Sequence, residues 1–274
     1  MLQTKIKSSF KGFWKQFRFN LSANDNPLFL SFYKYFYNPK KGGLSDFLSQ
    51  YSASKMGDFY VIQVGANDGI THDPIHKFIK RDRWKGVLLE PQPDVFRESL
   101  SKIYKNHPGL HPICAAIGYE DGSQKLYKIG FSTMRWATGL ASFSLEKIQK
   151  LFEDGIVQKN CQKLGIEIPT DPAKQITSEE VKVISPKTLL KTYEISKIDL
   201  LQVDAEGFDL EVIRMFDIPN THPNAIIFEN ENLNPRDLKE CYDLLKQEGY
   251  QLGEFGRDTL ALKKEFTQFD HFFK

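Results

Sequence analysis

The chain has 274 residues, enough for one large domain with its own hydrophobic core. Its composition is 41% hydrophobic and 26% charged, which excludes a disordered or collagen-like chain. The three cysteines are an odd number and lie far apart, which argues against disulfides and against a structural zinc site. No apolar run is long enough to cross a bilayer, and the first residues lack the apolar segment of a signal peptide, so we expect a cytoplasmic protein.

The net charge is only +2, but it is unevenly distributed along the chain. Residues 1–50 contain eight lysines and arginines against two acidic residues, so the remainder is mildly acidic. We therefore expect residues 1–50 to form a basic helical N-terminal extension. Residues 51–265 are expected to form the main domain, and residues 266–274 a C-terminal tail.

From residue 58 onward, short β-branched runs alternate with amphipathic stretches, which is typical of βαβ units and a largely parallel sheet. The pattern predicts strands at 58–64, 86–90 and 110–117, and helices at 73–83 and 93–104. A turn at 120–123 leads into a hairpin strand at 124–129. Residues 131–180 carry no clear strand signal, and we expect them to form an insertion over the sheet.

The regular alternation returns at residue 181 and continues almost to the end of the chain. It predicts strands at 181–184, 198–203 and 225–228, helices at 186–193, 208–215 and 235–248, and a closing antiparallel hairpin at 250–253 and 259–262. The fold class is therefore a doubly wound, Rossmann-like α/β sheet, mostly parallel, with an antiparallel last hairpin and an N-terminal helical extension.

The first predicted strand runs directly into the glycine-bracketed loop Gly65–Gly69. Glycines at such a turn permit positive φ and let a ligand approach the backbone, which indicates a nucleotide-type site at the carboxyl edge of the sheet. A tight turn without a ligand is the alternative. The next strand ends at Glu90, and a carboxylate there can accept both hydroxyl donors of a ribose. The dinucleotide fingerprint has glycines where Asn67 and Ile70 stand, so the loop favours S-adenosylmethionine over NAD.

Several motifs, in this order, resemble the FkbM family of S-adenosylmethionine-dependent methyltransferases. They are Val64–Gly69, Asp73-Pro74, Gly86–Pro93, Asp199–Asp209, Gly249-Tyr250 and Asp258–Ala261. The resemblance covers about residues 58 to 264. It implies a class I methyltransferase fold for the main domain and O-methylation, commonly of sugars or natural products. Residues 131–180 are then expected to cover the acceptor site.

The resemblance also implies where the donor binds. The loop residues Gly65, Ala66, Asn67, Asp68 and Gly69 would line its methionine part. Glu90 would hold the ribose with Pro91 beside it, Ala115, Ala116 and Ile117 would contact the adenine, and Asp204 would complete the cofactor-binding set.

Asp204 and Glu206 follow the strand at 198–203 and are the candidate catalytic residues. Methyl transfer to a hydroxyl needs the acceptor oxygen held in line and its proton removed, so a nearby base or a metal ion is useful. Asp204, Glu229 and Asn230 offer the oxygen ligands that Mg²⁺ prefers. A direct base, a metal-assisted reaction and a purely structural or donor-positioning role all stay open.

Two further pairs of residues have open roles. His72 could face the acceptor and act as a base near neutral pH, although we favour solvated helix positions for both His72 and His76. Arg135 and Trp136 could bind a sugar, with the ring stacking on an apolar sugar face and the guanidinium donating to hydroxyls. A core Trp beside a surface Arg is the alternative.

In the extension, Phe10, Phe13, Trp14 and Phe17 fall at helical spacing among basic residues. Such a stripe suits an anionic membrane surface, contacted through residues 5–19, but packing of the aromatics on the main domain is the favoured alternative. Nucleic acid is not expected as a partner, since the main domain is acidic.

We therefore expect an O-methyltransferase acting on a sugar, glycan or glycolipid precursor. The alternatives are an NAD-dependent sugar-modifying oxidoreductase and a non-catalytic glycan- or membrane-binding protein on the same fold.

Overall fold

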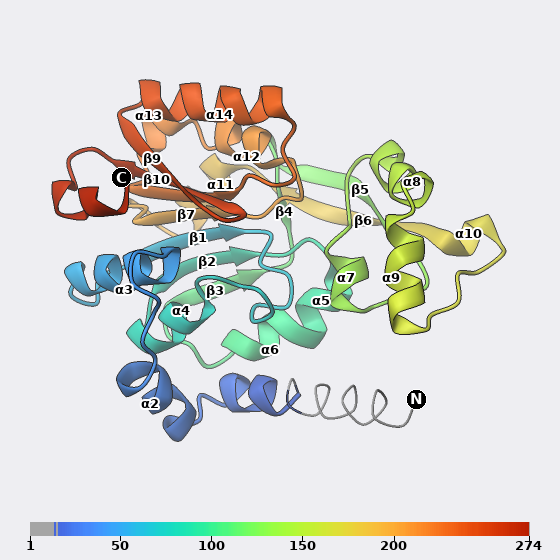
Figure 1. Cartoon of the computed structure of the whole chain (residues 1–274), viewed down its shortest axis with the longest axis horizontal. Coiled ribbons are helices and arrows are strands. Elements are labelled where there is room, and N and C mark those ends of the chain that lie inside the picture. Colours follow the sequence, from blue (N-terminus) through green and yellow to red (C-terminus); the bar gives the residue numbers. More distant parts are fainter. Residues whose placement is uncertain (1–13, 15, 274) are drawn as a thin grey trace.

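The protein is described here by a computed structural model that covers Trp14 and residues 16–273 (Figure 1). Its centre is a seven-stranded sheet in the order β3-β2-β1-β7-β8-β10-β9. The strands are β1 Tyr60–Val64, β2 Lys85–Leu89, β3 Leu110–Ile113, β7 Leu200–Val203, β8 Ala225–Glu229, β9 Tyr250–Phe255 and β10 Asp258–Lys263. Strands β3, β2, β1, β7 and β8 run parallel to one another. Strand β10 pairs antiparallel with both β8 and β9. The predicted doubly wound sheet with its antiparallel last hairpin is confirmed.

Helices cover both faces of this sheet because successive strand residues point to opposite sides. Val61 and Leu200 pack on one face against α3 Leu44–Ser54, α4 His76–Asp82 and the continuous helical run of α5 Pro93–Val95, η1 Phe96–Leu100 and α6 Ser101–Tyr104. Ile62 and Leu201 pack on the other face against α11 Pro186–Thr192, α12 Asp209–Met215, α13 Ile218–Thr221 and α14 Pro235–Gln247. The short helix η2 Thr267–Phe272 adds Phe269 and Phe272 to the first of these two cores.

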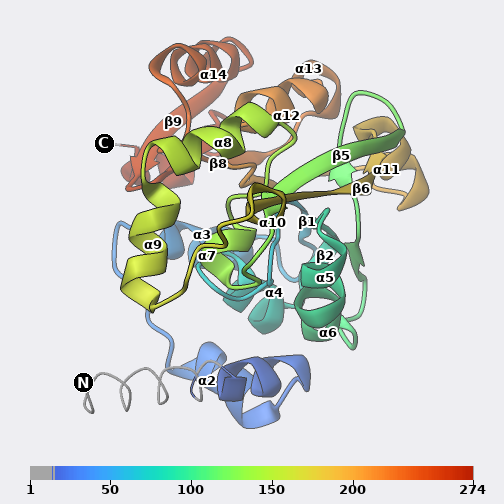
Figure 2. The same cartoon turned by 90° about the vertical axis from the view of Figure 1, so that its right-hand side faces the viewer.

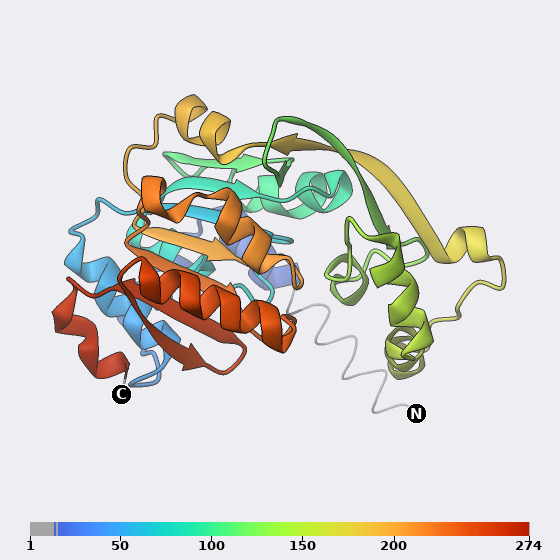
Figure 3. The same ribbon diagram turned by 90° about the horizontal axis from the view of Figure 1, so that it is seen from above.

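A second, three-stranded sheet stands beyond the ends of the main strands (Figures 2 and 3). Its order is β4-β6-β5, with β4 Ala116–Ile117, β5 Gly122–Ile129 and β6 Ile176–Ile184. Between β5 and β6 the chain forms α7 Arg135–Thr138, α8 Leu145–Glu153, α9 Ile156–Leu164 and α10 Pro172–Gln175. These helices enclose a small core of their own around Ile148, Val157 and Cys161.

Two strand predictions are wrong in this region. The single strand expected at 110–117 is two strands in different sheets, because residues 110–113 pair with β2 whereas residues 116–117 pair with β6. The strand expected at 181–184 begins at Ile176, inside the segment expected to lack strands. Most of the side chains from Ile176 to Glu180 are partly or fully exposed, so the apolar alternation that reveals a half-buried strand is missing there.

The helix expected from Asp73 begins at His76 instead. The Asp73 carboxylate accepts hydrogen bonds from the backbone N–H groups of Ile75 and His76, which fixes a turn before the helix. Helix α13 and η2 were not predicted. The extension was expected to be helical without stated bounds, and it contains α2 Pro27–Tyr35 and the start of α3, which continues past residue 50.

The extension is helical at residues 16–23 and again in α2, which contacts α4. Phe10 and Phe13 of the predicted aromatic stripe lie outside the described residues, whereas Trp14 and Phe17 are exposed. Among the residues described, no helix is both long and apolar enough to cross a bilayer.

Candidate functional site

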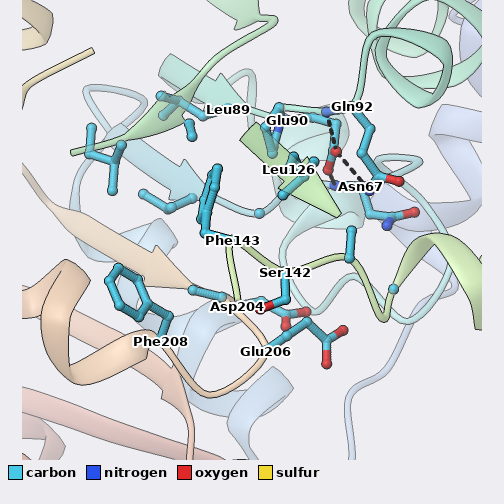
Figure 4. Close-up of a pocket in the computed structure, with 18 of the residues that line it drawn as sticks. Asn67, Leu89, Glu90, Gln92, Leu126, Ser142, Phe143, Asp204, Glu206 and Phe208 are labelled. Atoms are coloured by element: carbon cyan, nitrogen blue, oxygen red, sulfur yellow. Dashed lines mark hydrogen bonds between the residues drawn. The ribbon is translucent and has the colours of Figure 1, made fainter. Parts of the chain in front are cut away.

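A cavity of about 360 Å³ lies at the carboxyl ends of β1, β2 and β7 (Figure 4). One wall consists of the loops that follow these strands, and we call it the sheet wall; it includes Gly65, Asn67, Glu90 and Asp204. The opposite wall comes from β5, α7 and α8 and the loops between them, and we call it the insertion wall. Its members are Gln124, Leu126, Arg135, Thr138, Gly139, Ala141, Ser142, Phe143, Ser144 and Lys147.

The loop after β1 is held by backbone contacts on both sides. The backbone N–H groups of Gly65 and Ala66 both donate to the carbonyl O of Leu89, which joins this loop to the end of β2. Gly65 has φ +82°, and a Cβ at this position would overlap the backbone carbonyl O of Asp204. Only glycine therefore allows the loops after β1 and β7 to lie this close.

Glu90 is buried at the end of β2 and is the anchor of the sheet wall. Its Oε2 accepts from the backbone N–H of Asn67 at 2.9 Å, and its Oε1 accepts from the backbone N–H and the side-chain amide of Gln92 at 2.9 and 3.1 Å (Figure 4). Burial raises the pKa of this carboxyl to about 7, although these donors and Arg135 oppose the shift. Among the described residues Oε2 has one donor, which leaves it acceptor capacity for a ligand in the cavity.

The part of the cavity beside Glu90 is apolar and suits a flat heterocycle. Ala115 follows β3, Ala116 and Ile117 form β4 of the second sheet, and Phe208 and Val212 face the same cavity from the start and the body of α12. Together with Glu90, this arrangement has the chemistry that an adenosine group requires, namely an apolar slot and an acceptor for ribose hydroxyls. The residues present therefore fit the donor that the sequence predicts.

Carboxyl groups gather at the other end of the cavity, after β7 and β8. Asp204 and Glu206 line it, and burial raises the pKa of both. The pKa of Glu206 rises to about 8, because burial is reinforced by the charges of Asp204 and Glu229, while Arg135 and Lys147 oppose the shift. Glu206 has φ +51°, and Lys147 Nζ donates to its backbone carbonyl O from the insertion wall.

Asp209, the first residue of α12, supports this loop from below. It is fully buried, and its carboxylate accepts from the backbone N–H groups of Gly207 and Glu229 at 3.1 and 3.3 Å. Burial, with the charge of Asp204, raises its pKa to about 7. Asp209 thus joins the loop after β7 to the end of β8.

The candidate magnesium ligands Asp204, Glu229 and Asn230 find no support as a metal site in the structure. Glu229 already accepts from Arg257 and from the Asn232 side-chain amide, and the Asn230 amide donates to Thr259 Oγ1 at 3.1 Å. Within Trp14 and residues 16–273, no group of three or more His, Cys, Asp or Glu side chains is arranged to hold a metal ion.

Two of the sequence-predicted groups lie away from the cavity. His72 is exposed and is not among the residues that line it, and the same holds for Ala66, Asp68 and Gly69 of the loop. His76 is not the solvated helix residue that we expected. It is buried between Ser22 and the Tyr104 hydroxyl, and burial lowers its pKa to about 3.

The remaining predicted donor residues, Gly65, Asn67, Glu90, Pro91, Ala116, Ile117 and Asp204, all line the cavity. Arg135 lines it as well, and its charge lowers the pKa values of Glu90, Asp204 and Glu206. Trp136 packs in the small core of the insertion instead, with its ring 6.5 Å from that of Phe131. Sequence reasoning did not assign Gln92, Phe143, Lys147 and Phe208 to the site. Gln92 and Phe208 fall inside the motifs that resemble the family, whereas nothing local in the sequence marks Phe143 and Lys147.

Comparison with known proteins decides the family. Residues 63–252 match the family model of the methyltransferase FkbM domain. The chain belongs to the FkbM methyltransferase family. The FkbM domain thus extends from within β1 to within β9 and contains the whole cavity. No curated protein matches the chain.

Solved structures with a similar arrangement are distant in sequence. The FkbM methyltransferase of Methylobacillus flagellatus is 10% identical, with a TM-score of 0.44 over 75% of this chain and 44% of that one. The chain therefore spans less than half the length of that protein. The Podospora anserina methyltransferase PaMTH1, solved with S-adenosylhomocysteine, is 10% identical, with a TM-score of 0.38 over 79% of this chain and 76% of that one. A fibrillarin from Methanococcus jannaschii is 13% identical, with a TM-score of 0.37 over 75% and 66%.

Proposed function

We propose that the chain transfers the methyl group of S-adenosylmethionine to a hydroxyl of a sugar, glycan or glycolipid precursor. The observation that carries the proposal is that Glu206 lines the same cavity as Glu90. A proton acceptor in the cavity that binds the donor is what O-methylation requires, because a sugar hydroxyl is a weak nucleophile until its proton is removed.

The sheet wall is suited to hold the donor. Glu90 Oε2 would accept from the ribose hydroxyls, Ala116 and Ile117 would contact the adenine, and Gly65 and Asn67 would bound the amino-acid end, since all five line the cavity. When bound, S-adenosylmethionine supplies a methyl group on a positively charged sulfur, which an oxygen takes by in-line displacement as the carbon–sulfur bond breaks. Asp204 lies at the end of β7 and provides a negative charge that favours this cation.

Glu206 is the base in this proposal. Its raised pKa of about 8 makes the carboxylate more basic than an ordinary glutamate, and the deprotonated form takes the hydroxyl proton as the oxygen attacks, so activity should rise as the pH passes through about 8. The Asn232 side-chain amide donates to its Oε2 at 3.1 Å and Lys147 to its backbone carbonyl, so the carboxylate is held in place. We propose no metal in the reaction.

The proposed acceptor class is based on the insertion wall and on a second cavity of about 850 Å³ that adjoins the first. Arg135, Ser142 and Ser144 offer donors for hydroxyl oxygens, and Phe143 offers an aromatic face. The second cavity shares Asn67, Gln92, Arg135 and Thr138 with the first and contains Trp136, Lys128 and Asn160. Two adjoining cavities suit an acceptor longer than one sugar unit.

The test measures donor binding and methyl transfer separately. Calorimetric titration should show binding of S-adenosylhomocysteine and none of NAD. Labelled S-adenosylmethionine should then transfer its methyl group to members of a panel of oligosaccharides and lipid-linked sugars, with the product an O-methyl ether by NMR.

Glu206→Gln should lower kcat about 10²- to 10⁴-fold and leave S-adenosylhomocysteine binding within a factor of about three. Glu231→Gln is the matched control, because Glu231 is an exposed carboxylate beyond the end of β8 that pairs with Arg257. Binding of NAD in place of S-adenosylhomocysteine would point to the oxidoreductase alternative. Donor binding without transfer to any oligosaccharide or lipid-linked sugar would contradict the acceptor class, and full activity of Glu206→Gln would remove Glu206 as the base.

A further inference from the structure

Helix α2 is apolar on two sides, which is unusual for a helix at the surface of a protein. Its inner side packs on the main domain: Tyr33 is buried, and Tyr37 just after the helix lies edge-on to Phe78 of α4, 6.2 Å between centroids. Lys77 of α4 donates to the Tyr37 hydroxyl at 2.8 Å. These contacts account for one side of α2 only.

The opposite side consists of Leu28, Phe32, Tyr35 and Phe36, and we call it the outer face of α2. These four side chains are 83%, 54%, 70% and 74% exposed. They fall at i, i+4, i+7 and i+8, so they form one stripe, and the rings of Phe32 and Phe36 stack with centroids 6.1 Å apart. Figures 1 and 2 show α2 at one edge of the molecule, outside the two sheets. A contiguous exposed apolar stripe of this kind marks an interaction surface.

The charge around the outer face is positive. Lys34, Lys40 and Lys41 are exposed, and Lys34 Nζ lies 5.4 Å from the Tyr35 ring centroid. The two acidic residues of the extension form contacts within the protein and do not offset this positive charge. Asp25 pairs with the buried Lys80 at 2.7 Å, and Asp46 accepts from the backbone N–H of Gly42 at 2.8 Å at the start of α3.

We propose that the outer face of α2 docks on a bilayer surface rich in anionic lipid. Aromatic and leucine side chains enter the headgroup boundary while the neighbouring lysines stay at the level of the lipid charges, as in helices that lie in the membrane plane. Docking of a second copy through the same face would bring the lysines of both copies together, and their mutual repulsion opposes it. This inference is independent of the proposed function.

The experiment is flotation of the full chain with vesicles of phosphatidylcholine and phosphatidylglycerol in equal parts, and with vesicles of phosphatidylcholine alone. We expect the chain to float with the anionic vesicles only, and a rise in salt to release it. The double variant Phe32→Ser/Phe36→Ser should reduce the partition coefficient at least tenfold. Met56→Ser is the control, because Met56 is an even more exposed apolar side chain but lies on the loop after α3.

A second variant makes the result independent of folding effects. Phe36→Trp keeps the aromatic character, and its fluorescence should be quenched by vesicles with brominated acyl chains beyond the quenching of the wild-type tryptophans.

Several results would overturn the proposal. They are equal flotation of Phe32→Ser/Phe36→Ser and the wild type, loss of flotation in Phe10→Ser/Phe13→Ser alone, and a dimer that Phe32→Ser/Phe36→Ser dissociates in the absence of any vesicle binding.

Discussion

The two walls of the cavity are built in different ways. On the sheet wall, Gly65 and Glu90 are fixed by hydrogen bonds to backbone groups of neighbouring loops, and Asp209 fixes the loop after β7 in the same way from outside the cavity. On the insertion wall, Arg135, Ser144 and Lys147 project from short helices and loops and are partly or fully exposed. Backbone geometry thus defines the side suited to the donor, whereas replaceable side chains define the side suited to the acceptor.

Gly65→Ala should have the largest effect on stability, because it disrupts the backbone packing of the sheet wall. The new Cβ overlaps the Asp204 carbonyl, and alanine is strained at φ +82°. We expect a loss of at least about 3 kcal/mol in the free energy of unfolding, measured by denaturant titration. Gly155→Ala in the insertion is the control: it has φ +72° but nothing within 4 Å of its Cβ, so about 1 kcal/mol is expected. Equal losses in both variants would mean that the close approach of the two loops does not matter.

Glu90→Gln tests the side chain of the sheet wall. The amide keeps the shape of the carboxyl group but loses its charge and must turn an N–H₂ group toward either Asn67 or Gln92. We expect a ten- to hundredfold loss of S-adenosylhomocysteine affinity by calorimetry, about 1.5–3 kcal/mol. Unchanged affinity would show that the donor does not contact Glu90.

Arg135→Ala tests whether the insertion wall binds the acceptor and not the donor. Removing this side chain should raise the KM for the acceptor about tenfold, roughly 1.4 kcal/mol, through lost hydrogen bonds to hydroxyls. Steady-state kinetics with the acceptor varied checks this, and calorimetry should show donor affinity changed less than threefold. A large loss of donor affinity would mean that the insertion wall also binds the donor.

The smallest effect concerns pH. The folded-state pKa values of Glu90 and Asp209 are raised to about 7, so stability is highest when both are protonated and falls as pH rises from about 4 through 7. Thermal unfolding should therefore give a lower Tm at pH 8 than at pH 5. In Asp209→Asn the decline should be smaller, whatever the variant's overall stability, because one of the two titrating groups is removed. The same slope in both proteins would show that Asp209 does not titrate in this range.

The sheet wall could be predicted from the sequence because its signals are local. The apolar strand before Gly65 and the carboxylate that ends β2 each stand next to the element that positions them. The insertion wall could be predicted only in part: Arg135 was a candidate from the sequence, but Phe143 and Lys147 reach the cavity only through the pairing of β5 with β6. The first half of β6 is polar and partly exposed, so the hydrophobic periodicity of the sequence does not reveal that it is a strand. His76 misled us for a related reason, because its partner Ser22 is 54 residues away.

The pairing of β4 with β6 has a consequence for how such chains vary. Ile117 lies opposite Ile184, so the chain leaves and rejoins the body at neighbouring points of one ladder. The pairing of β4 with β6 thus holds the two ends of residues 118–183 together whatever lies between them. The ordering entropy of a different segment would then depend only weakly on its length. This one segment can therefore differ in length and sequence between chains while the rest of the sheet stays the same.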